Sequence, residues 1–275
     1  MTPVRMAFYA PEEIFLETKK QVQKIRGKEE EIDYLTFVPD GEPTLDLNLH
    51  REVELLRQLD LPIAMLTNAS LIWEKNVRNT LCEFDLVSLK IDAVSENMWR
   101  RIDRPHRSLS PEEILDGIVE FSEDYEGTII TETMFIDGVD YSDEISRIAE
   151  FLAGIRIKSA YISIPTRPPA ENWVRPASES ILNHAYWSFS ERLGNERVEL
   201  LIGYEGDTFA STGNLEVDLL SITSVHPMRK DAVKKLVEEA GAKWDSVEKL
   251  LQANKLIELE YESEVYYMRK LPSRG

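Results

Sequence analysis

Short apolar runs recur through most of the chain and predict the strands of a parallel sheet. Few of these runs alternate strictly between apolar and polar residues, so both faces of each strand are expected to be covered, as in parallel sheets. The runs are Tyr34–Val38, Ile63–Thr67, Leu86–Ile91, Thr128–Ile136, Ala160–Ile164 and Val198–Tyr204.

Helix-like segments separate the apolar runs. Pro11–Arg26 opens with Pro-Glu-Glu, and Ser110–Tyr125 opens with Ser-Pro-Glu-Glu. Both openings suit a first helical turn, because proline and acidic residues are favoured there. The other predicted helices are Leu47–Leu59, Asp143–Gly154 and Ser178–Leu193. Alternating strands and helices predict right-handed βαβ units in an α/β fold, arranged either as an open doubly wound sheet or as a barrel.

The pattern changes near residue 215. Three short helices are predicted there, followed by two alternating strands, an order that resembles a winged helix. The segments are Asp218–Val225, Lys230–Ala240, Lys243–Gln252, Ile257–Tyr261 and Val265–Arg269. We therefore expect a large α/β domain over residues 1–214 and a winged-helix-like domain over residues 215–275.

Composition narrows the class of protein. The net charge of −18 opposes nonspecific binding to nucleic acid. The predicted wing carries Glu258, Glu260, Glu262 and Glu264, so DNA binding by the C-terminal domain is not expected, and docking against the large domain or a partner protein is favoured. No apolar stretch is long enough to span a membrane, and a cytoplasmic location is expected.

The chain has a single cysteine, Cys82, which excludes an internal disulfide and a cysteine-rich zinc site. Cys82 lies beside Phe84 in a helix-like stretch, where we expect it to be a small buried apolar residue.

Polar residues gather where the predicted strands end. Asn68 follows the second run, Lys90 and Asp92 close the third, Glu132 lies within the fourth and Ser163 ends the fifth. Because ligands bind at the carboxyl ends of parallel strands, we expect a site there.

The turn after the first run is the most informative segment. Gly41, Glu42 and Pro43 predict a tight turn with exposed backbone carbonyl groups. Together with the Glu42 carboxylate, such carbonyls can receive an ammonium group. The other interpretation is an ordinary strand-to-helix turn.

Gly41-Glu42-Pro43-Thr44 resembles the Gly-Glu-Pro motif of the radical S-adenosylmethionine enzymes. Further segments are similar to one branch, the iron–sulfur oxidoreductases akin to wyosine-forming enzymes of tRNA modification. They are Asp33–Leu45, Leu66–Asn68, Val87–Ala93, Arg104–His106, Thr131–Met134 and Tyr161–Pro169. The resemblance covers about residues 8–210 and implies a partial or full parallel barrel.

The resemblance also implies a role for each matching position. The turn of Gly41, Glu42, Pro43 and Thr44 would bind the methionine amino group of S-adenosylmethionine. The other expected contacts are to ribose or carboxylate (Asn68, Lys90 and Glu132) and to the adenine side (Ser163 and Ile164).

One feature of that family is missing from this sequence. Its members hold a [4Fe–4S] cluster through Cys-x-x-x-Cys-x-x-Cys in a loop after the first strand, upstream of a segment like Phe8–Ile14. Only seven residues precede Phe8 here, so we expect the first strand and the cysteine loop to be absent. Either the chain is a fragment of a longer active enzyme, or it is a natural homologue without radical chemistry; the retained strand-end residues favour the fragment.

A basic group in this acidic chain is a candidate substrate contact. Arg104 and His106 lie close together in sequence, with Arg101 and Arg107 nearby, and Arg167 is a candidate for the same face. Such residues suit an anionic substrate or phosphate, although salt bridges to nearby acids explain them equally well. The substrate itself is not predicted.

Two other functions stay open. One is a non-catalytic module that binds a nucleotide-like ligand or a partner protein. The other is a barrel enzyme in which Glu42, Asp92 and Glu132 act as acid, base or metal ligands. Absence of the first strand also predicts an exposed sheet edge and self-association through it.

Overall fold

The computed structural model describes residues 3–28, 31–38, 41–169, 171–201, 214–225, 227–261 and 263–270. The chain divides into two compact units. The first comprises Met1–Lys20, Ile32–Pro165 and Val174–Ile202, and the second comprises Gln21–Glu31, Thr166–Trp173 and Gly203–Gly275. The domain boundary expected at residue 214 stays a prediction.

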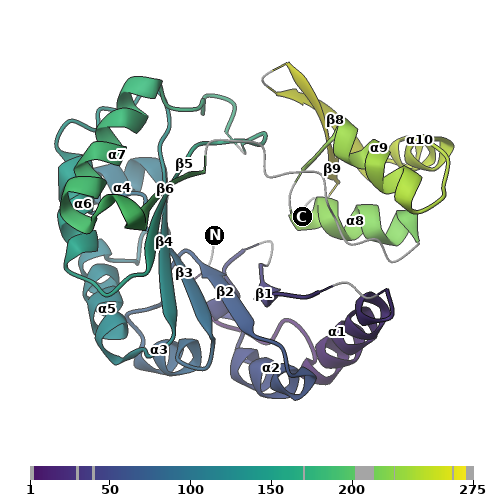
Figure 1. The fold of residues 1–275 in the computed structure, drawn as a ribbon, viewed down its shortest axis with the longest axis horizontal. Coiled ribbons are helices and arrows are strands. Elements are labelled where there is room, and N and C mark those ends of the chain that lie inside the picture. Colours follow the sequence, from purple (N-terminus) through teal and green to yellow (C-terminus); the bar gives the residue numbers. More distant parts are fainter. Residues whose placement is uncertain are drawn as a thin grey trace. The chain divides into compact units, whose positions relative to one another are not determined.

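The first unit is built on a six-stranded parallel sheet (Figure 1). Its strands are β1 (Leu35–Phe37), β2 (Ile63–Thr67), β3 (Leu86–Lys90), β4 (Thr128–Met134), β5 (Ser159–Ser163) and β6 (Val198–Leu201). Each strand lies beside its neighbour in sequence, in the order β1-β2-β3-β4-β5-β6. A doubly wound sheet reverses its strand order at a switch point, whereas this sheet winds in one direction, as a barrel does. The arrangement is therefore consistent with a partial barrel.

The helices of this unit lie between the strands in sequence. They are α1 (Pro11–Arg26), whose last residues belong to the second unit, α2 (Leu49–Leu56), α3 (Lys75–Leu81), α4 (Glu96–Ile102), α5 (Pro111–Asp124), α6 (Glu144–Ala153) and α7 (Glu179–Leu193). Short 3₁₀ turns are η1 (Pro43–Leu45), η2 (Arg57–Leu59) and η3 (Asn195–Arg197). The predicted start of α5 is confirmed, since Ser110 Oγ accepts a hydrogen bond from Glu113 N and Pro111 is the first helical residue.

The two faces of the sheet differ. Alternate residues such as Val87, Ile129 and Ile162 are buried, and helices including α2, α5 and α7 lie along the convex side (Figure 1). Lys90 and Glu132 occupy the alternate positions, which face the other side of the sheet. About a third of each of these side chains is exposed. The sheet therefore has one apolar face and one face with polar groups near its carboxyl edge.

Close backbone packing explains one helical glycine. A Cβ on Gly117 in α5 would lie 2.8 Å from the Ile72 carbonyl oxygen and from backbone atoms of Trp73. Glycine lets α5 approach the segment after β2, at the usual cost in helix propensity.

The second unit combines helices with a small antiparallel sheet. Its elements are α8 (Leu215–Val225), β7 (Met228–Arg229), α9 (Lys230–Glu239), α10 (Asp245–Gln252), β8 (Leu256–Tyr261) and β9 (Glu264–Arg269), with strand order β7-β9-β8. Leu219, Val233, Val247 and Tyr267 form its buried core. Glu262 and residues 202–204, which belong to predicted strands or turns, lie outside the described residues.

Within the part of the chain that the structure describes, every helix is too short or too polar to cross a membrane.

Candidate functional site

The turn after β1 is organised around the side chain of Glu42. Its Oε1 accepts hydrogen bonds from Thr44 N (3.1 Å), Thr44 Oγ1 (2.7 Å) and Thr67 Oγ1 (2.6 Å). Its Oε2 accepts one from Asn68 N (2.8 Å). The carboxylate caps η1 and joins the ends of β1 and β2. A carboxylate offers about four acceptor positions, so Oε2 retains capacity for a further donor.

The electrostatic state of Glu42 reflects two opposing effects. Its side chain is buried, and this loss of solvation raises the pKa of the carboxyl, while the hydrogen bonds from Thr44, Thr67 and Asn68 act to lower it. Burying a carboxyl group costs free energy unless its oxygens accept hydrogen bonds, and the four donors around Glu42 offset this cost.

The neighbours of Glu42 divide into buried and exposed positions. Pro43 and Thr44 are buried, whereas Gly41 is exposed. A Cβ on Gly41 would meet nothing within 4 Å, so there is open space beside this backbone. Asn68 is also exposed, and its Oδ1 accepts a hydrogen bond from Ser70 N (2.9 Å). The turn can therefore receive a ligand group beside Gly41.

A second polar group lies on β3, β4 and β5. Lys90 and Glu132 are register partners, and Lys90 Nζ lies 3.6 Å from Glu132 Oε1. Ser163 Oγ donates to the same Glu132 oxygen at 2.8 Å. Lys90 Nζ also lies 3.4 Å from Asp92 Oδ1. The structure thus brings together four residues that were selected from the sequence, at the expected edge of the sheet.

The Lys90 cluster, defined as Lys90, Asp92, Asp103 and Glu132, contains three carboxyl groups and one ammonium group. Burial alone lowers the pKa of Lys90, but Asp92, Glu132 and Asp103 raise it above its ordinary value. Burial and the neighbouring Asp92 raise the pKa of Asp103 to about 8, against a lowering effect of Lys90. Asp103 was not predicted from the sequence, because it follows α4 and not a strand.

The candidate substrate residues occupy the turn after α4. Arg104 is exposed and has φ of 49°, a left-handed conformation that costs a non-glycine residue roughly 1–2 kcal/mol. His106 is half-buried, and its Nδ1 lies 2.8 Å from Ser108 Oγ and accepts from Ser108 N at 3.3 Å. Ile164 follows β5 directly and is half-buried, and Arg167 belongs to the second unit.

The prediction for Cys82 is wrong. This residue is exposed, because it lies at the C-terminal cap of α3, beyond the last buried residue Leu81. Partial burial and the nearby Asp124 and Glu83 raise the pKa of its thiol, which disfavours the thiolate that binds metals. Cys82 also precedes β3 and so lies near the amino ends of the strands, away from the Glu42 turn. It does not fit the role of an iron–sulfur ligand at this site.

Among the described residues, no three His, Cys, Asp or Glu side chains come close enough together to hold a metal ion. The residues at the carboxyl edge do fit a ligand with ammonium and hydroxyl groups, because the Lys90 cluster has an excess of carboxyl groups and the backbone beside Gly41 is open.

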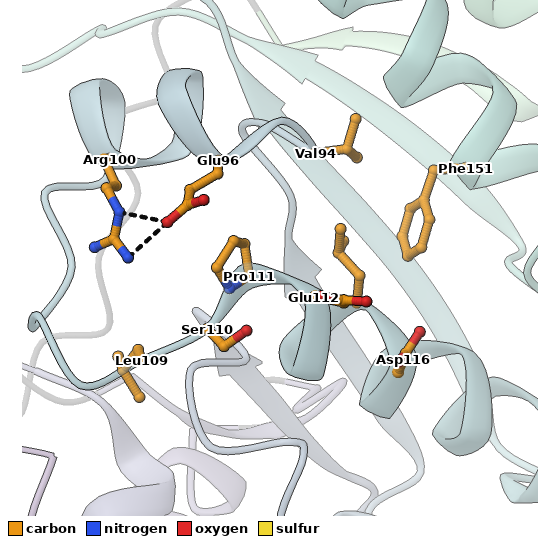
Figure 2. Close-up of a pocket in the computed structure, with 10 residues that line it drawn as sticks. Val94, Glu96, Arg100, Leu109, Ser110, Pro111, Glu112, Asp116 and Phe151 are labelled. Atoms are coloured by element: carbon orange, nitrogen blue, oxygen red, sulfur yellow. Dashed lines mark hydrogen bonds and ion pairs between the residues drawn. The ribbon is translucent and has the colours of Figure 1, made fainter.

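A shallow hollow of about 570 Å³ lies elsewhere in the first unit, around the start of α5 (Figure 2). Val94, Leu109 and Phe151 contribute apolar surface, while Glu112 and Asp116 contribute charge. None of the residues selected from the sequence lines it. The hollow is therefore separate from the site predicted at the strand ends.

Solved structures with a similar fold include a radical SAM methyltransferase and a protein solved with bound S-adenosylmethionine. A radical SAM methyltransferase from Sphaerobacter thermophilus has a TM-score of 0.57 and 14% identity, over 72% of this chain and 59% of that chain. Streptococcus suis SuiB bound to S-adenosylmethionine has a TM-score of 0.52 and 11% identity, over 73% of this chain and 47% of that chain. At such low identity these likenesses establish the fold, and this chain spans less than two thirds of either protein.

No family model matches the chain. Among curated proteins, the UPF0026 protein MJ1312 of Methanocaldococcus jannaschii is 44% identical over 271 residues, which make up 98% of this chain and 84% of that protein. A UPF0026 protein of Helicobacter pylori is 35% identical over 140 residues, or 50% of this chain and 45% of that protein. The high identity over almost the whole length shows that the chain belongs to the UPF0026 family.

Proposed function

We propose that this chain forms the core of a radical S-adenosylmethionine-type enzyme and binds S-adenosylmethionine at the carboxyl edge of its sheet. The observation that carries this proposal is the joining of Lys90, Glu132 and Ser163 across three neighbouring strands. The similar folds of the methyltransferase and SuiB support it. Membership of the branch similar to wyosine-forming enzymes is part of the same proposal and rests on the sequence motifs.

The proposal divides the cofactor between two groups of residues. The amino group would lie beside the Gly41 backbone and the remaining acceptor position of Glu42 Oε2, with Pro43 and Thr44 supporting the turn. Asn68, Lys90 and Glu132 would contact ribose or carboxylate, and Ser163 and Ile164 would lie on the adenine side. When bound with a cluster, S-adenosylmethionine would supply a 5′-deoxyadenosyl radical.

Calorimetry tests the binding site directly. We expect S-adenosylmethionine to bind the full chain and the Glu132→Gln variant to bind about ten- to a hundredfold more weakly, since a charged hydrogen bond contributes roughly 1.5–3 kcal/mol. Glu126→Gln is the matched control, because Glu126 is exposed before β4. A wild-type chain that does not bind S-adenosylmethionine overturns the proposal, and equal affinities in both variants remove Glu132 from the site.

We further propose that the described residues of this chain do not ligate the [4Fe–4S] cluster. Cys82 is the single cysteine of the sequence, and the raised pKa of its thiol disfavours the thiolate form, which supports this view. Reconstitution of the chain with iron and sulfide should give no cluster absorbance. A cluster that forms here and disappears in Cys82→Ser contradicts the proposal. Cofactor binding without cleavage would instead favour the non-catalytic module.

The second unit is proposed to be of the winged-helix type. The order helix, strand, helix, helix, strand, strand supports this class, with β7-β9-β8 as its sheet. Glu258, Glu260 and Glu264 make the β8–β9 hairpin acidic and would repel phosphate, so a protein contact is favoured over DNA. A DNA-binding assay at low salt should therefore show no retardation of duplex DNA.

A further inference from the structure

The strap, defined as residues 4–9, precedes α1 and pairs with the chain directly beyond the Glu42 turn. Met6 N donates to the Leu45 carbonyl oxygen at 3.0 Å, and Leu47 N donates to the Met6 carbonyl oxygen at 3.1 Å. The two segments run parallel at this point and belong to the same compact unit. The strap therefore lies within reach of the residues that form the turn.

Arg5 makes the side-chain contacts between the strap and the turn. Its Nε donates to the Thr44 carbonyl oxygen at 2.9 Å, and its Nη2 donates to the Asp46 carbonyl oxygen at 3.1 Å. Arg5 is half-buried, and both acceptor residues are buried. Because a guanidinium group holds its donors in a rigid planar fork, these two bonds fix the direction of both carbonyl groups. Thr44 is thus bonded twice, since its N–H and hydroxyl groups donate to Glu42.

These bonds decide which backbone carbonyl groups of the turn are open to a ligand. Each carbonyl group from position 42 to position 46 accepts a hydrogen bond from within the chain. In order, the donors are Leu45 N, Asp46 N, Arg5 Nε, Met6 N and Arg5 Nη2. Gly41 differs from them, because no described residue donates to its carbonyl group, and it is exposed beside open space. Two of the five occupied carbonyl groups depend on Arg5.

We propose that Arg5 is a positioning residue of the S-adenosylmethionine site. By holding Thr44 and Asp46, it keeps the turn in the arrangement that leaves the Gly41 carbonyl group and Glu42 Oε2 as acceptors for the ammonium group of the ligand. Arg5 contacts no ligand itself and acts through the backbone. The assignment to this ligand rests on the proposed function, whereas the hold of Arg5 on the turn does not.

The hold is tested without a ligand, by hydrogen exchange of the Thr44 and Asn68 amides, which both donate to Glu42. Arg5→Met keeps the length of the side chain but has no donor, so we expect both exchange rates to rise about tenfold. Arg5→Lys can donate from only a single ammonium group and should give a smaller rise. Arg51→Met, at an exposed arginine of α2, should leave both rates unchanged. Unchanged rates in Arg5→Met overturn the hold.

The positioning role is tested by calorimetry with two thioethers that share the same nucleoside. S-adenosylhomocysteine carries the amino acid group, and 5′-methylthioadenosine lacks it. We expect Arg5→Met to bind S-adenosylhomocysteine about tenfold more weakly than wild type and to bind 5′-methylthioadenosine equally well, because only the first ligand places an ammonium group beside Gly41. Arg5→Lys should lie between wild type and Arg5→Met, and Arg51→Met should match wild type for both ligands.

The two ligands separate positioning from general support of the fold. Equal weakening of both ligands in Arg5→Met, or equal affinities of wild type and Arg5→Met for S-adenosylhomocysteine, overturns the positioning role. If Arg5→Met does not fold, Arg5→Lys carries the same comparison. A wild-type chain that binds neither ligand overturns the proposed function and the assignment of Gly41, while the exchange rates still decide whether Arg5 holds the turn.

Discussion

The Glu42 turn and the Lys90 cluster lie at the same edge of one sheet, but they differ in the number of hydrogen-bond donors and positive charges available to each carboxyl group. Glu42 is a single carboxyl surrounded by four hydrogen-bond donors. The Lys90 cluster has one ammonium group for three carboxyl groups. The first arrangement is nearly complete without a ligand, while the second has acceptor capacity left over. The difference suggests that the Glu42 turn builds the edge and the Lys90 cluster responds to ligands and pH.

The largest effect is expected from removing the acceptor in the Glu42 turn. Glu42→Ala leaves two backbone N–H groups and two threonine hydroxyls without their acceptor. We expect the free energy of unfolding, measured in urea, to fall by roughly 3–5 kcal/mol, because each buried unsatisfied group costs about 1–3 kcal/mol. Glu42→Gln keeps one acceptor oxygen and should lose less than half of that.

Glu54→Ala is the control for this experiment. Glu54 is exposed on α2 and pairs with Arg51, so its loss should change stability by less than about 1 kcal/mol. If Glu42→Ala costs no more than Glu54→Ala, the four hydrogen bonds do not organise the turn and the contrast between the two regions fails.

A smaller effect is expected from removing the cation of the Lys90 cluster. Lys90→Met leaves Asp92, Glu132 and Asp103 without a balancing charge. We expect a loss of about 2 kcal/mol at pH 8.5, measured by urea unfolding, because unpaired carboxylates repel one another in a partly buried site. The loss should shrink at pH 4.5, because Asp103, whose pKa is raised to about 8, is then protonated and adds no negative charge. Lys75→Met, at an exposed position of α3, should be nearly neutral at both values.

A penalty for Lys90→Met that is the same at both pH values would contradict this picture. It would mean that Lys90 contributes through packing of its methylene chain instead of through charge. The Lys90 cluster would then resemble the Glu42 turn, as a structural element without spare electrostatic capacity.

Much of the fold was predictable because strong local signals and burial agree. Helix α1 and strand β2 have the predicted bounds, Pro11–Arg26 and Ile63–Thr67. Strands β3, β4 and β5 differ by one or two residues at their ends. Helix α4 was not predicted, because it buries no residue and so shows no apolar stripe. The two-residue strand β7 is too short to leave a pattern.

The site was predictable where its residues end strands. Lys90, Glu132 and Ser163 were selected for that reason, and they do meet. Asp103 was missed because its proximity to Lys90 and Asp92 depends on the tertiary position of α4. Cys82 was wrongly predicted to be buried, because hydrophobic neighbours in sequence do not decide which side of a helix end faces solvent. The choice between barrel and doubly wound sheet required the strand order itself.

The smallest effect is expected at a carboxyl outside both regions, which has neither the hydrogen-bond donors of Glu42 nor the cation of the Lys90 cluster. Glu52 of α2 is buried, and its Oε1 has no hydrogen-bond partner among the described residues. Burial, and then the nearby Asp46, raise the pKa of Glu52 to about 7. An acid whose folded pKa exceeds its unfolded value of about 4.5 loses stability as pH rises from about 4.5 to about 7.

Glu52→Gln removes this ionisation, so its stability relative to wild type should be higher at pH 8 than at pH 5, by on the order of 1 kcal/mol. Thermal unfolding of both proteins at the two pH values measures the difference. Glu54→Gln, on the exposed side of α2, should show no such change. If Glu52→Gln shifts equally at both values, Glu52 already finds a partner when it ionises. Burial alone would then not explain why Glu52 differs from Glu42. The contrast with the Lys90 cluster depends on how many hydrogen-bond donors each carboxyl has, and that number would have to be measured at each carboxyl separately.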